Sequence, residues 1–498
     1  MRKLIVVLFL IFITYNISAA FYGLIDPDEP RYAATAKNMV LENQYIIPYF
    51  NGNLRINKPP LTYWLIAASY KMFKINEYFS RLPHILFAFF IIFFGVLLFK
   101  SHLSYEERVT FALILASTPL FFYLGKYCNT DIILSGFFIF SIYFFYLYIE
   151  KERAIFLNLF YISYFFTNLT KGPVAYLIIL IILLFLFFEK SIKKLYNLKF
   201  WLIVLFLSLT PFLYLLLVSL KVNHSLNIIH LITTETVGRF FKGYRHPEPI
   251  YFYLKFFPLL FFPWSIFFIY KIFNLKNLWG QNSFNRLNII YFFTVFIFFS
   301  LSRSKLLSYI LPITFPFAYL TVNLIRDVDF KIKSNFFIII YGALFLLLVS
   351  FLLIKKYLIP DYSVLLILLF FVVVYIVLLK YENNFLNKFA YFQMLLLLTV
   401  FLLGSNFLSE NKSEKFLQKV TLEKKIPIIS YRRDITGIAF YKQNYLKVDN
   451  INDLEKFKNF YMVSYKSDFK KVEDKLKFCN KLAESKLKIL VKCNEPNN

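Results

Sequence analysis

The sequence predicts an α-helical polytopic membrane protein with a small α/β domain after the last span. Of its 498 residues, 59% are hydrophobic and only 17% are charged, which is far from the composition of a soluble protein of this length. The charged residues lie in short clusters between apolar runs. After residue 408 the chain becomes rich in Lys and Glu. We therefore expect a membrane domain over 1–408 and a soluble domain over 409–498.

About thirteen apolar segments have roughly the length that a helix needs to cross a bilayer. They are 4–25, 82–99, 109–124, 132–149, 154–170, 173–188, 200–220, 250–270, 288–301, 306–325, 336–354, 363–379 and 387–407. The first follows Arg2 and Lys3 and ends near small residues, as a signal peptide does. Its apolar run continues to Ile25, so we interpret it as an uncleaved span.

The basic residues between these spans predict the orientation. The loops on the N-terminal side hold most of them: Lys100, Arg108, Lys151, Arg153, Lys190, Lys193, Lys194, Lys199, Lys271, Lys276, Arg286, Arg326, Lys331, Lys333, Lys380 and Lys388. By the positive-inside rule the N-terminus is cytoplasmic. An odd number of spans then places 409–498 on the exoplasmic face, together with the long loop 26–81. The net charge of +27 is explained by these loops, and no basic helix or aromatic-basic module indicates nucleic acid.

The loop 26–81 begins with a dense polar motif. Its charged residues are Asp26, Asp28, Glu29 and Arg31. Charges so close to a bilayer are costly unless a site uses them. The simpler interpretation is a solvated loop in which Asp28 caps a helix over 32–40.

Two further residues extend this motif. Asn51-Gly52 indicates a turn, and Lys58 then precedes two prolines and a helical pattern over 61–73. A lysine held rigidly at the interface suits a phosphate near lipid headgroups. Asp131 opens a span from the exoplasmic side, where it either lines a site or serves only as a helix cap.

Two more exoplasmic segments carry polar residues. The segment 221–249 contains Glu235 and His246, the latter in a proline-fixed motif. Metal ligation by His246 with a carboxylate stays open, as does a divalent metal cofactor. A short turn carries Arg303 and Lys305, a cationic pair suited to an anionic headgroup. The other histidines, at 84, 102, 224 and 230, are interpreted as packing or interfacial residues.

The last region contains two β-like runs, 426–431 and 460–465, and a helical pattern over 467–488. Its Cys479 and Cys493 are candidates for one disulfide if this region lies in an oxidising compartment. Cys128 stands alone near a membrane segment.

Seven motifs occur in one order along the chain: DPDEPRY, NGNLRINKPPLTYW, NEYFSRLP, NTD, ETVGRF…HPEPIYFY, FPWS and SRSKLLSYILPITFPFA. In this order they resemble the ArnT-type lipid A aminoarabinose transferases, which are GT-C glycosyltransferases related to the protein O-mannosyltransferases. The resemblance covers most of the chain and implies thirteen spans with an exoplasmic C-terminal domain. It also implies an inner-membrane enzyme that transfers a sugar from a polyprenyl (undecaprenyl) phosphate carrier to an exoplasmic acceptor.

The resemblance further implies the roles of the polar residues. The catalytic set is Asp28, Lys58 and Asp131, and the substrate-binding set is Asp26, Glu29, Arg31, Glu235, His246, Arg303 and Lys305. Lys58, Arg303 and Lys305 would bind phosphate. The chain has Asn57 where the family commonly has Glu before Lys-Pro-Pro, and this departure puts a metal in doubt.

The sequence leaves three matters open. The sugar is aminoarabinose or another, and the acceptor is lipid A, another glycolipid or a protein hydroxyl. A hydroxyl acceptor needs a general base, for which Asp28 is the candidate, whereas an ionised phosphate acceptor needs none. A transporter or flippase for a lipid-linked sugar, or an assembly protein, is the alternative class. The apolar centres of the spans disfavour transport.

Overall fold

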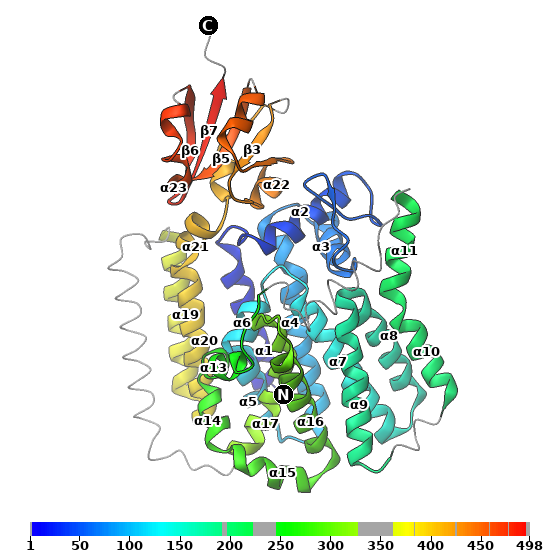
Figure 1. The fold of residues 1–498 in the computed structure, drawn as a ribbon. Coiled ribbons are helices and arrows are strands. Elements are labelled where there is room, and N and C mark those ends of the chain that lie inside the picture. Colours follow the sequence, from blue (N-terminus) through cyan, green and yellow to red (C-terminus); the bar gives the residue numbers. More distant parts are fainter. Residues whose placement is uncertain are drawn as a thin grey trace.

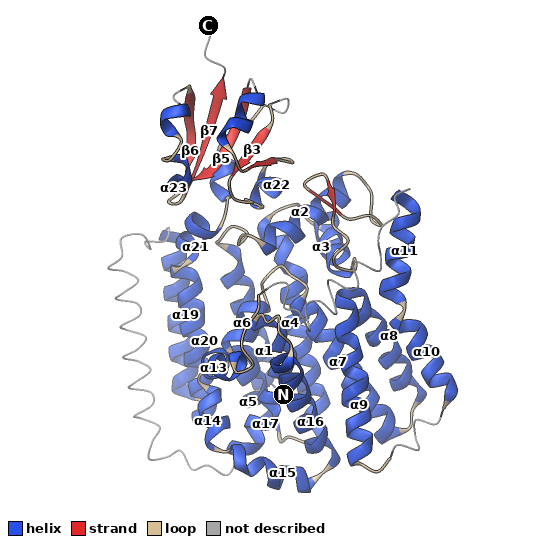
Figure 2. Ribbon diagram, viewed as in Figure 1, coloured by secondary structure: helices blue, strands red, loops and turns tan. Residues whose placement is uncertain are grey.

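The structure is a computed structural model that describes residues 2–191, 197–222, 246–326, 362–382, 384–423, 426–457, 459–476 and 478–494. A bundle of long helices makes up most of it, and a small domain with a β-sheet lies beyond one end of the bundle (Figure 1). Figure 2 shows that the strands are confined to this small domain and to one short hairpin beside α3. This confirms the predicted fold class.

The bundle is built from helices of very different length. Its described helices are α1 (Arg2–Ala20), α4 (Glu77–Leu98), α5 (Tyr105–Ser117), α6 (Pro119–Leu124), α7 (Asp131–Lys151), α8 (Ala154–Lys171), α9 (Tyr176–Phe188), α10 (Leu198–Ser208), α11 (Thr210–Val222), α13 (Phe252–Leu260), α14 (Trp264–Tyr270), α15 (Leu275–Gln281), α16 (Ser283–Leu301), α17 (Thr314–Ile325), α19 (Tyr362–Tyr381), α20 (Phe385–Leu403) and α21 (Ser405–Lys412). A 3₁₀ segment, η6 (Leu307–Ile313), leads into α17.

Eight helical segments of the described part are long and apolar enough to span a membrane. A ninth is added if α13 and α14, which are bent by 119° at their junction, form one span. The predicted span 336–354 lies outside the described residues, so the total of thirteen stays a prediction. The apolar part of α19 that fits the predicted span 363–379 is Leu366–Tyr381.

One of the eight segments, Ala154–Phe188, reverses direction inside the bundle. At one end of α7, Asp131 pairs with Lys171 at the end of α8. Near the other end of α7, the ring of Tyr146 lies 5.9 Å from that of Phe185, close to the end of α9. The chain therefore turns back at Gly172, which has φ +55°, and α8 and α9 are two passes, as the sequence predicts.

Ion pairs gather at the end of the bundle that lies away from the small domain. Lys3 contacts Glu106 at 2.5 Å and Glu382 at 3.2 Å. Arg286 contacts Glu189 at 2.5 Å. The Lys3 pairs join the N-terminal ends of α1 and α5 to the C-terminal end of α19, and the Arg286 pair joins the N-terminal end of α16 to the C-terminal end of α9.

The small domain contains a five-stranded mixed sheet of order β4-β3-β5-β7-β6. The strands are β3 (Ile428–Tyr431), β4 (Leu446–Val448), β5 (Asn459–Tyr465), β6 (Cys479–Glu484) and β7 (Lys488–Asn494), and its short helices are α22 (Gly437–Tyr441) and α23 (Lys466–Phe469). The strand β3 pairs in parallel with β4 and β5, whereas β7 pairs antiparallel with β5 and β6. The two β-like runs of the sequence are thus confirmed as β3 and β5.

The helix predicted over 467–488 is wrong for most of its length. Among the described residues of that range, only α23 and a 3₁₀ turn at Glu473–Leu476 are helical, and β6 follows. β6 is the edge strand of the sheet, and most of its residues are exposed. Polar, charged residues are usual on such an edge because they discourage pairing with other chains, and they hide the alternation that marks a strand.

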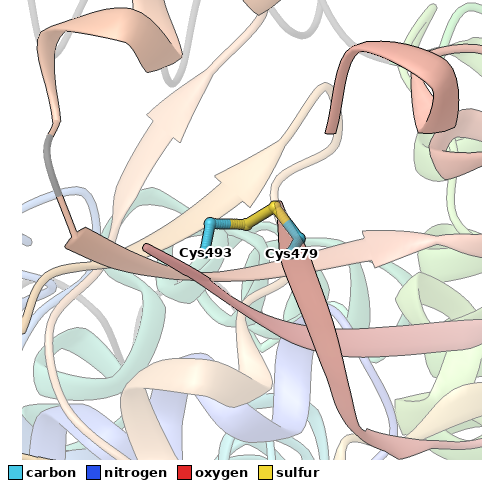
Figure 3. The surroundings of a disulfide bond; sticks show 2 residues. All are labelled: Cys479 and Cys493. Carbon is cyan, nitrogen blue, oxygen red and sulfur yellow. A yellow bond between two sulfur atoms is a disulfide. The ribbon is translucent and has the colours of Figure 1, made fainter. Parts of the chain in front are cut away.

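A disulfide joins β6 to β7. Cys479 and Cys493 are register partners, and their sulfur atoms are bonded (Figure 3). The pairing that the sequence left conditional is thus present, and Cys128 is free and buried.

The small domain shares a hydrophobic core with the loop 26–81. This loop contains α2 (Asp28–Leu41), a hairpin of β1 (Tyr49–Phe50) and β2 (Asn53–Leu54), and α3 (Leu61–Met72). One cluster of buried side chains contains Tyr32 and Met39 of the loop and Leu24 just before it, together with Ile438 and Phe440 of α22. The small domain and the loop 26–81 therefore meet over α2.

Candidate functional site

Asp28 is the first residue of α2, and its carboxylate faces solvent. Its side chain is 50% exposed, and an Arg31 nitrogen lies 3.8 Å away. The residue at the N-cap position is Pro27, and no side chain caps the helix. Asp28 is therefore not a helix cap, and its carboxylate is open to a ligand.

Glu29, in contrast, is fully occupied inside the protein. Its oxygens accept hydrogen bonds from Arg81 Nε at 2.8 Å and Arg81 Nη2 at 2.6 Å. They also accept bonds from the backbone N–H groups of Ile25 (2.8 Å) and Cys128 (2.9 Å). The side chains of Glu29 and Arg81 are both 0% exposed. A substrate contact would require this buried pair to open.

Arg81 uses all of its donors at the same place. Besides Glu29, it donates to the carbonyl oxygens of Ala19, Tyr22 and Gly23 at 2.9–3.1 Å. The five N–H groups of a guanidinium suit such a fork of acceptors. Arg81 thus fixes the chain between the end of α1 and the start of α2.

Asp26 is turned toward the small domain. Its Oδ1 accepts hydrogen bonds from the backbone N–H of Thr436 at 3.1 Å and from the Thr436 hydroxyl. Its own N–H donates to the Lys412 carbonyl at 2.7 Å. Burial raises the pKa of Asp26, against the lowering effect of the nearby Lys488 charge.

Asp131 opens α7 and lies in a network of side chains. Lys171 Nζ contacts its Oδ1 at 2.8 Å, and Asn129 Nδ2 donates to Oδ2 at 2.8 Å. Ser308 adds a side-chain hydrogen bond. The alternative of a simple helix cap therefore does not describe Asp131, because its carboxylate bonds side chains from three different segments.

Tyr32 links Asp28 to this network. Both carboxylates, Asp28 and Asp131, act electrostatically on its hydroxyl, as does Arg55, while burial raises its pKa. The charge of Lys58 in turn acts on Asp131. Asp28 and Asp131 thus both lie within electrostatic range of Tyr32, and Lys58 lies within electrostatic range of Asp131.

Aromatic rings surround this polar group. Tyr32 stacks on Tyr63 with centroids 5.4 Å apart, and the Arg55 guanidinium lies 5.2 Å from the Tyr32 centroid. Tyr123 and Tyr127, whose rings stack at 5.2 Å, also lie within electrostatic range of Asp28. Tyrosine presents an apolar face and a polar tip, which suits a sugar ring with its hydroxyls.

A second group forms where the strap 246–248 meets the turn 303–305. The two segments pair through Glu248 N–H to Arg303 O and Lys305 N–H to His246 O, both at 3.0 Å. Lys305 Nζ donates to the carbonyls of Glu248, at 2.9 Å, and Ser302, and its side chain is buried. His246 and Arg303 are exposed. Of this cationic pair, Arg303 faces outward and Lys305 holds the turn.

Glu235 lies outside the described residues. Within the described ranges, no group of three or more His, Cys, Asp or Glu residues is placed to hold a metal ion. Asn57, which replaces the family's Glu, leaves its Oδ1 buried without a hydrogen bond. The described residues therefore do not form a fitting metal site, and no step below uses a metal.

Two important residues did not emerge from the sequence as site residues. The sequence places Lys171 between two predicted spans, and it places Arg81 at the end of the loop 26–81. The signal for Lys171 was its presence on the face where the positive-inside rule makes lysine rare. Nothing local marks Arg81, because its partner Glu29 is 52 positions away.

Comparison of the sequence with known proteins identifies several that are similar to this chain. Residues 57–217 match the family described as dolichyl-phosphate-mannose-protein mannosyltransferase. A protein of Aquifex aeolicus (strain VF5) is 29% identical over 67% of this chain and 66% of its own length. The undecaprenyl phosphate-alpha-4-amino-4-deoxy-L-arabinose arabinosyl transferase of Wigglesworthia glossinidia brevipalpis is 26% identical over 66% of this chain and 60% of its own. The matched regions thus span about two thirds of these relatives' length or less.

The fold is that of a solved membrane protein. The crystal structure of ArnT from Cupriavidus metallidurans bound to undecaprenyl phosphate superimposes with a TM-score of 0.79 over 99% of this chain and 98% of that one, at 17% identity. Its apo state gives a TM-score of 0.74 with the same coverage. In sequence and in fold the chain is thus similar to these arabinosyl transferases, and part of it is similar to the mannosyltransferase family.

Proposed function

We propose that this protein transfers a sugar from an undecaprenyl phosphate carrier to an acceptor on the exoplasmic side of the inner membrane. The observation that carries the proposal is the half-exposed Asp28 carboxylate, which lies within electrostatic range of the same tyrosine, Tyr32, as the Asp131 carboxylate with its cations Lys171 and Lys58. It lies at the bundle end that meets the small domain. The likeness to ArnT and to the mannosyltransferase family supports the same reaction.

The leaving group in this reaction is a lipid phosphate. Its charge grows as the bond to the sugar breaks, so preorganised cations are the groups that lower the barrier most. Lys58 and Lys171 lie around Asp131, and the exposed Arg303 lies five residues before Ser308, which bonds the same carboxylate. Asp131 keeps Lys171 in place, and Lys305 keeps the Arg303 turn in place.

The role of Asp28 depends on the acceptor. A phosphate acceptor is already ionised and attacks without a base, so Asp28 then orients the sugar. A hydroxyl acceptor loses a proton during attack, and the exposed Asp28 carboxylate is placed to accept it. In both cases the acceptor oxygen displaces the carrier phosphate from the sugar carbon in a single inverting step.

Lipid A with aminoarabinose is our first candidate pair, because the arabinosyl transferase relatives carry that sugar in their names. A protein hydroxyl is the second candidate acceptor, because the family model that matches residues 57–217 describes protein mannosyltransferases. The Cys479–Cys493 disulfide supports the exoplasmic orientation, since disulfides persist in oxidising compartments.

Mass spectrometry of lipid A and total glycolipids, from cells with and without the gene, tests this proposal. We expect one glycolipid or glycoprotein species to lose a sugar when the gene is absent. A gene for Asp28→Asn should fail to restore it, whereas Glu42→Gln, an exposed carboxylate at the other end of α2, should restore it. Identical glycoconjugates with and without the gene would contradict the proposal.

A further inference from the structure

Asp26 stands in the same motif as Asp28, but it points into a buried group of charges in the small domain. Glu414 follows α21, and Lys488 begins β7. Lys488 Nζ donates to Glu414 Oε1, and both side chains are 0% exposed. The charge of Lys488 acts on Asp26, and the charge of Asp26 acts on Glu414. We call Asp26, Thr436, Glu414 and Lys488 the Asp26 cluster.

The Asp26 cluster has little room to rearrange. A Cβ added at Gly437 would lie 1.8 Å from Glu414 Oε2, so the carboxylate fits tightly against the start of α22. The same oxygen is buried without a hydrogen-bond partner. A buried carboxylate with an unpaired oxygen is costly unless its environment serves another purpose.

The small domain also contacts the β1–β2 hairpin and α2. The Asn51 side chain exchanges two hydrogen bonds with the Tyr445 backbone, at 2.6 and 2.8 Å. Asn51 lies at the turn of the β1–β2 hairpin, which leads directly to Arg55 and Lys58. Arg31 of α2 contacts Asp434 at 3.2 Å, and Tyr445 OH donates to the same carboxylate.

On the basis of the proposed function, we propose that Asp26 is a positioning residue for Asp28. Through Thr436 and the Glu414–Lys488 pair, it fixes the first turn of α2 and therefore the place of Asp28 opposite Asp131. The segment 432–445 of the small domain is then part of the catalytic apparatus, although none of its residues touches the reacting atoms.

Charge in the Asp26 cluster should depend on pH. Burial, then the Asp26 charge, raises the pKa of Glu414 to about 7, against the lowering effect of Lys488. The other ionisable groups that face the cluster are Arg31 and Tyr445 beside Asp26, and Tyr465 under Lys488. Loss of the Glu414 proton leaves two carboxylates beside one lysine, which loosens the attachment of α2.

The test compares purified full-length variants in detergent micelles. Asp26→Asn removes the charge, Thr436→Val removes the hydroxyl that bonds Asp26, and Thr436→Ser retains it. The matched control is Asp449→Asn, an exposed carboxylate of the same domain that pairs only with Lys447 among the described residues. We measure kcat and KM for the carrier-linked sugar, the pH profile of kcat, and hydrogen exchange in peptides that cover α2.

We expect Asp26→Asn and Thr436→Val to lower kcat at least tenfold, with KM for the donor changed less than about threefold. Exchange in α2 should rise in both variants, and Thr436→Ser should return both quantities to the wild-type values. Glu414→Gln should remove a fall in kcat above pH 7. If Asp26→Asn does not fold, the two Thr436 variants give the same comparison.

Wild-type exchange in α2 and a wild-type kcat in Thr436→Val would overturn the positioning role while leaving the proposed function intact. If the wild-type protein itself does not turn over the donor, the proposed function fails. The exchange measurement still decides the positioning role in that case, because unchanged protection of α2 in Asp26→Asn and Thr436→Val overturns it.

Discussion

Removal of the Glu29 charge should be among the most damaging single changes in the chain. Glu29→Gln keeps the size of the side chain but replaces one acceptor oxygen by a donor. Glu29 accepts four hydrogen bonds, two of them from Arg81, so the new amide must point at another donor. It also leaves the buried Arg81 charge without its counter-ion.

The expected loss follows from this geometry. Removing one partner of a buried ion pair costs about 3–5 kcal/mol of unfolding free energy. A hydrogen bond to a charged group contributes about 1.5–3 kcal/mol to stability. Its loss overlaps with the loss of the ion pair, so the two figures are not added. We therefore expect a loss of about 3–5 kcal/mol for Glu29→Gln, and a similar loss for Arg81→Met.

The assay is unfolding by denaturant in mixed micelles, with a double-mutant cycle. The double variant Glu29→Gln with Arg81→Met should lose less than the sum of the single losses, because contacting residues couple by about 0.5–3 kcal/mol. Glu42→Gln, on the exposed end of the same helix, is the control and should change the unfolding free energy by less than about 0.5 kcal/mol. A loss below about 1 kcal/mol for Glu29→Gln, or strict additivity in the double variant, would refute this reasoning.

Three further outcomes are expected. The unfolding free energy should fall as the pH rises from about 4.5 to 7, because the pKa of Glu414 in the folded protein is about 7, against an ordinary value of 4.5. The slope should be at most about 1.4 kcal/mol per pH unit. In thermal melting at several pH values, Glu414→Gln should remove this pH dependence. Gly437→Ala should lower the melting temperature, because its Cβ would lie 1.8 Å from Glu414 Oε2, and an unchanged melting temperature would show that the contact relaxes freely. Lys171→Met should weaken binding of undecaprenyl phosphate at least tenfold, because it removes the cation that pairs directly with Asp131, and equal affinity in a micelle binding titration would remove Lys171 from the phosphate site.

The large features of the fold could be predicted from the sequence, because each membrane span is a continuous run of apolar residues. The hairpin of α8 and α9 was visible as two apolar runs around Lys171-Gly172-Pro173. The start of the site was visible for a similar reason, since the acids of the first loop stand alone between apolar segments. The boundary predicted from composition, between residues 408 and 409, falls within α21.

What the sequence could not give is the set of contacts between distant segments. Asp26, Asp28 and Glu29 look alike in a row of letters, yet one reaches Thr436, one faces solvent and one is buried with Arg81. Helix geometry separates Asp28 from Glu29, because neighbouring residues of a helix point to different sides, whereas Asp26 lies before α2 begins. The strand β6 was missed because its stability depends on its partner β7 rather than on its own apolar pattern.

The most direct test of the central claim is an in vitro transfer assay with the purified protein. Purified protein in micelles is mixed with an undecaprenyl-phosphate-linked aminoarabinose and lipid A, and the release of free undecaprenyl phosphate is followed by mass spectrometry. The arrangement of Asp28, Lys58 and Asp131 predicts release by the wild-type protein, and a loss of at least a hundredfold in Asp28→Asn with the fold intact. Release at the wild-type rate by Asp28→Asn would contradict the assignment of this site.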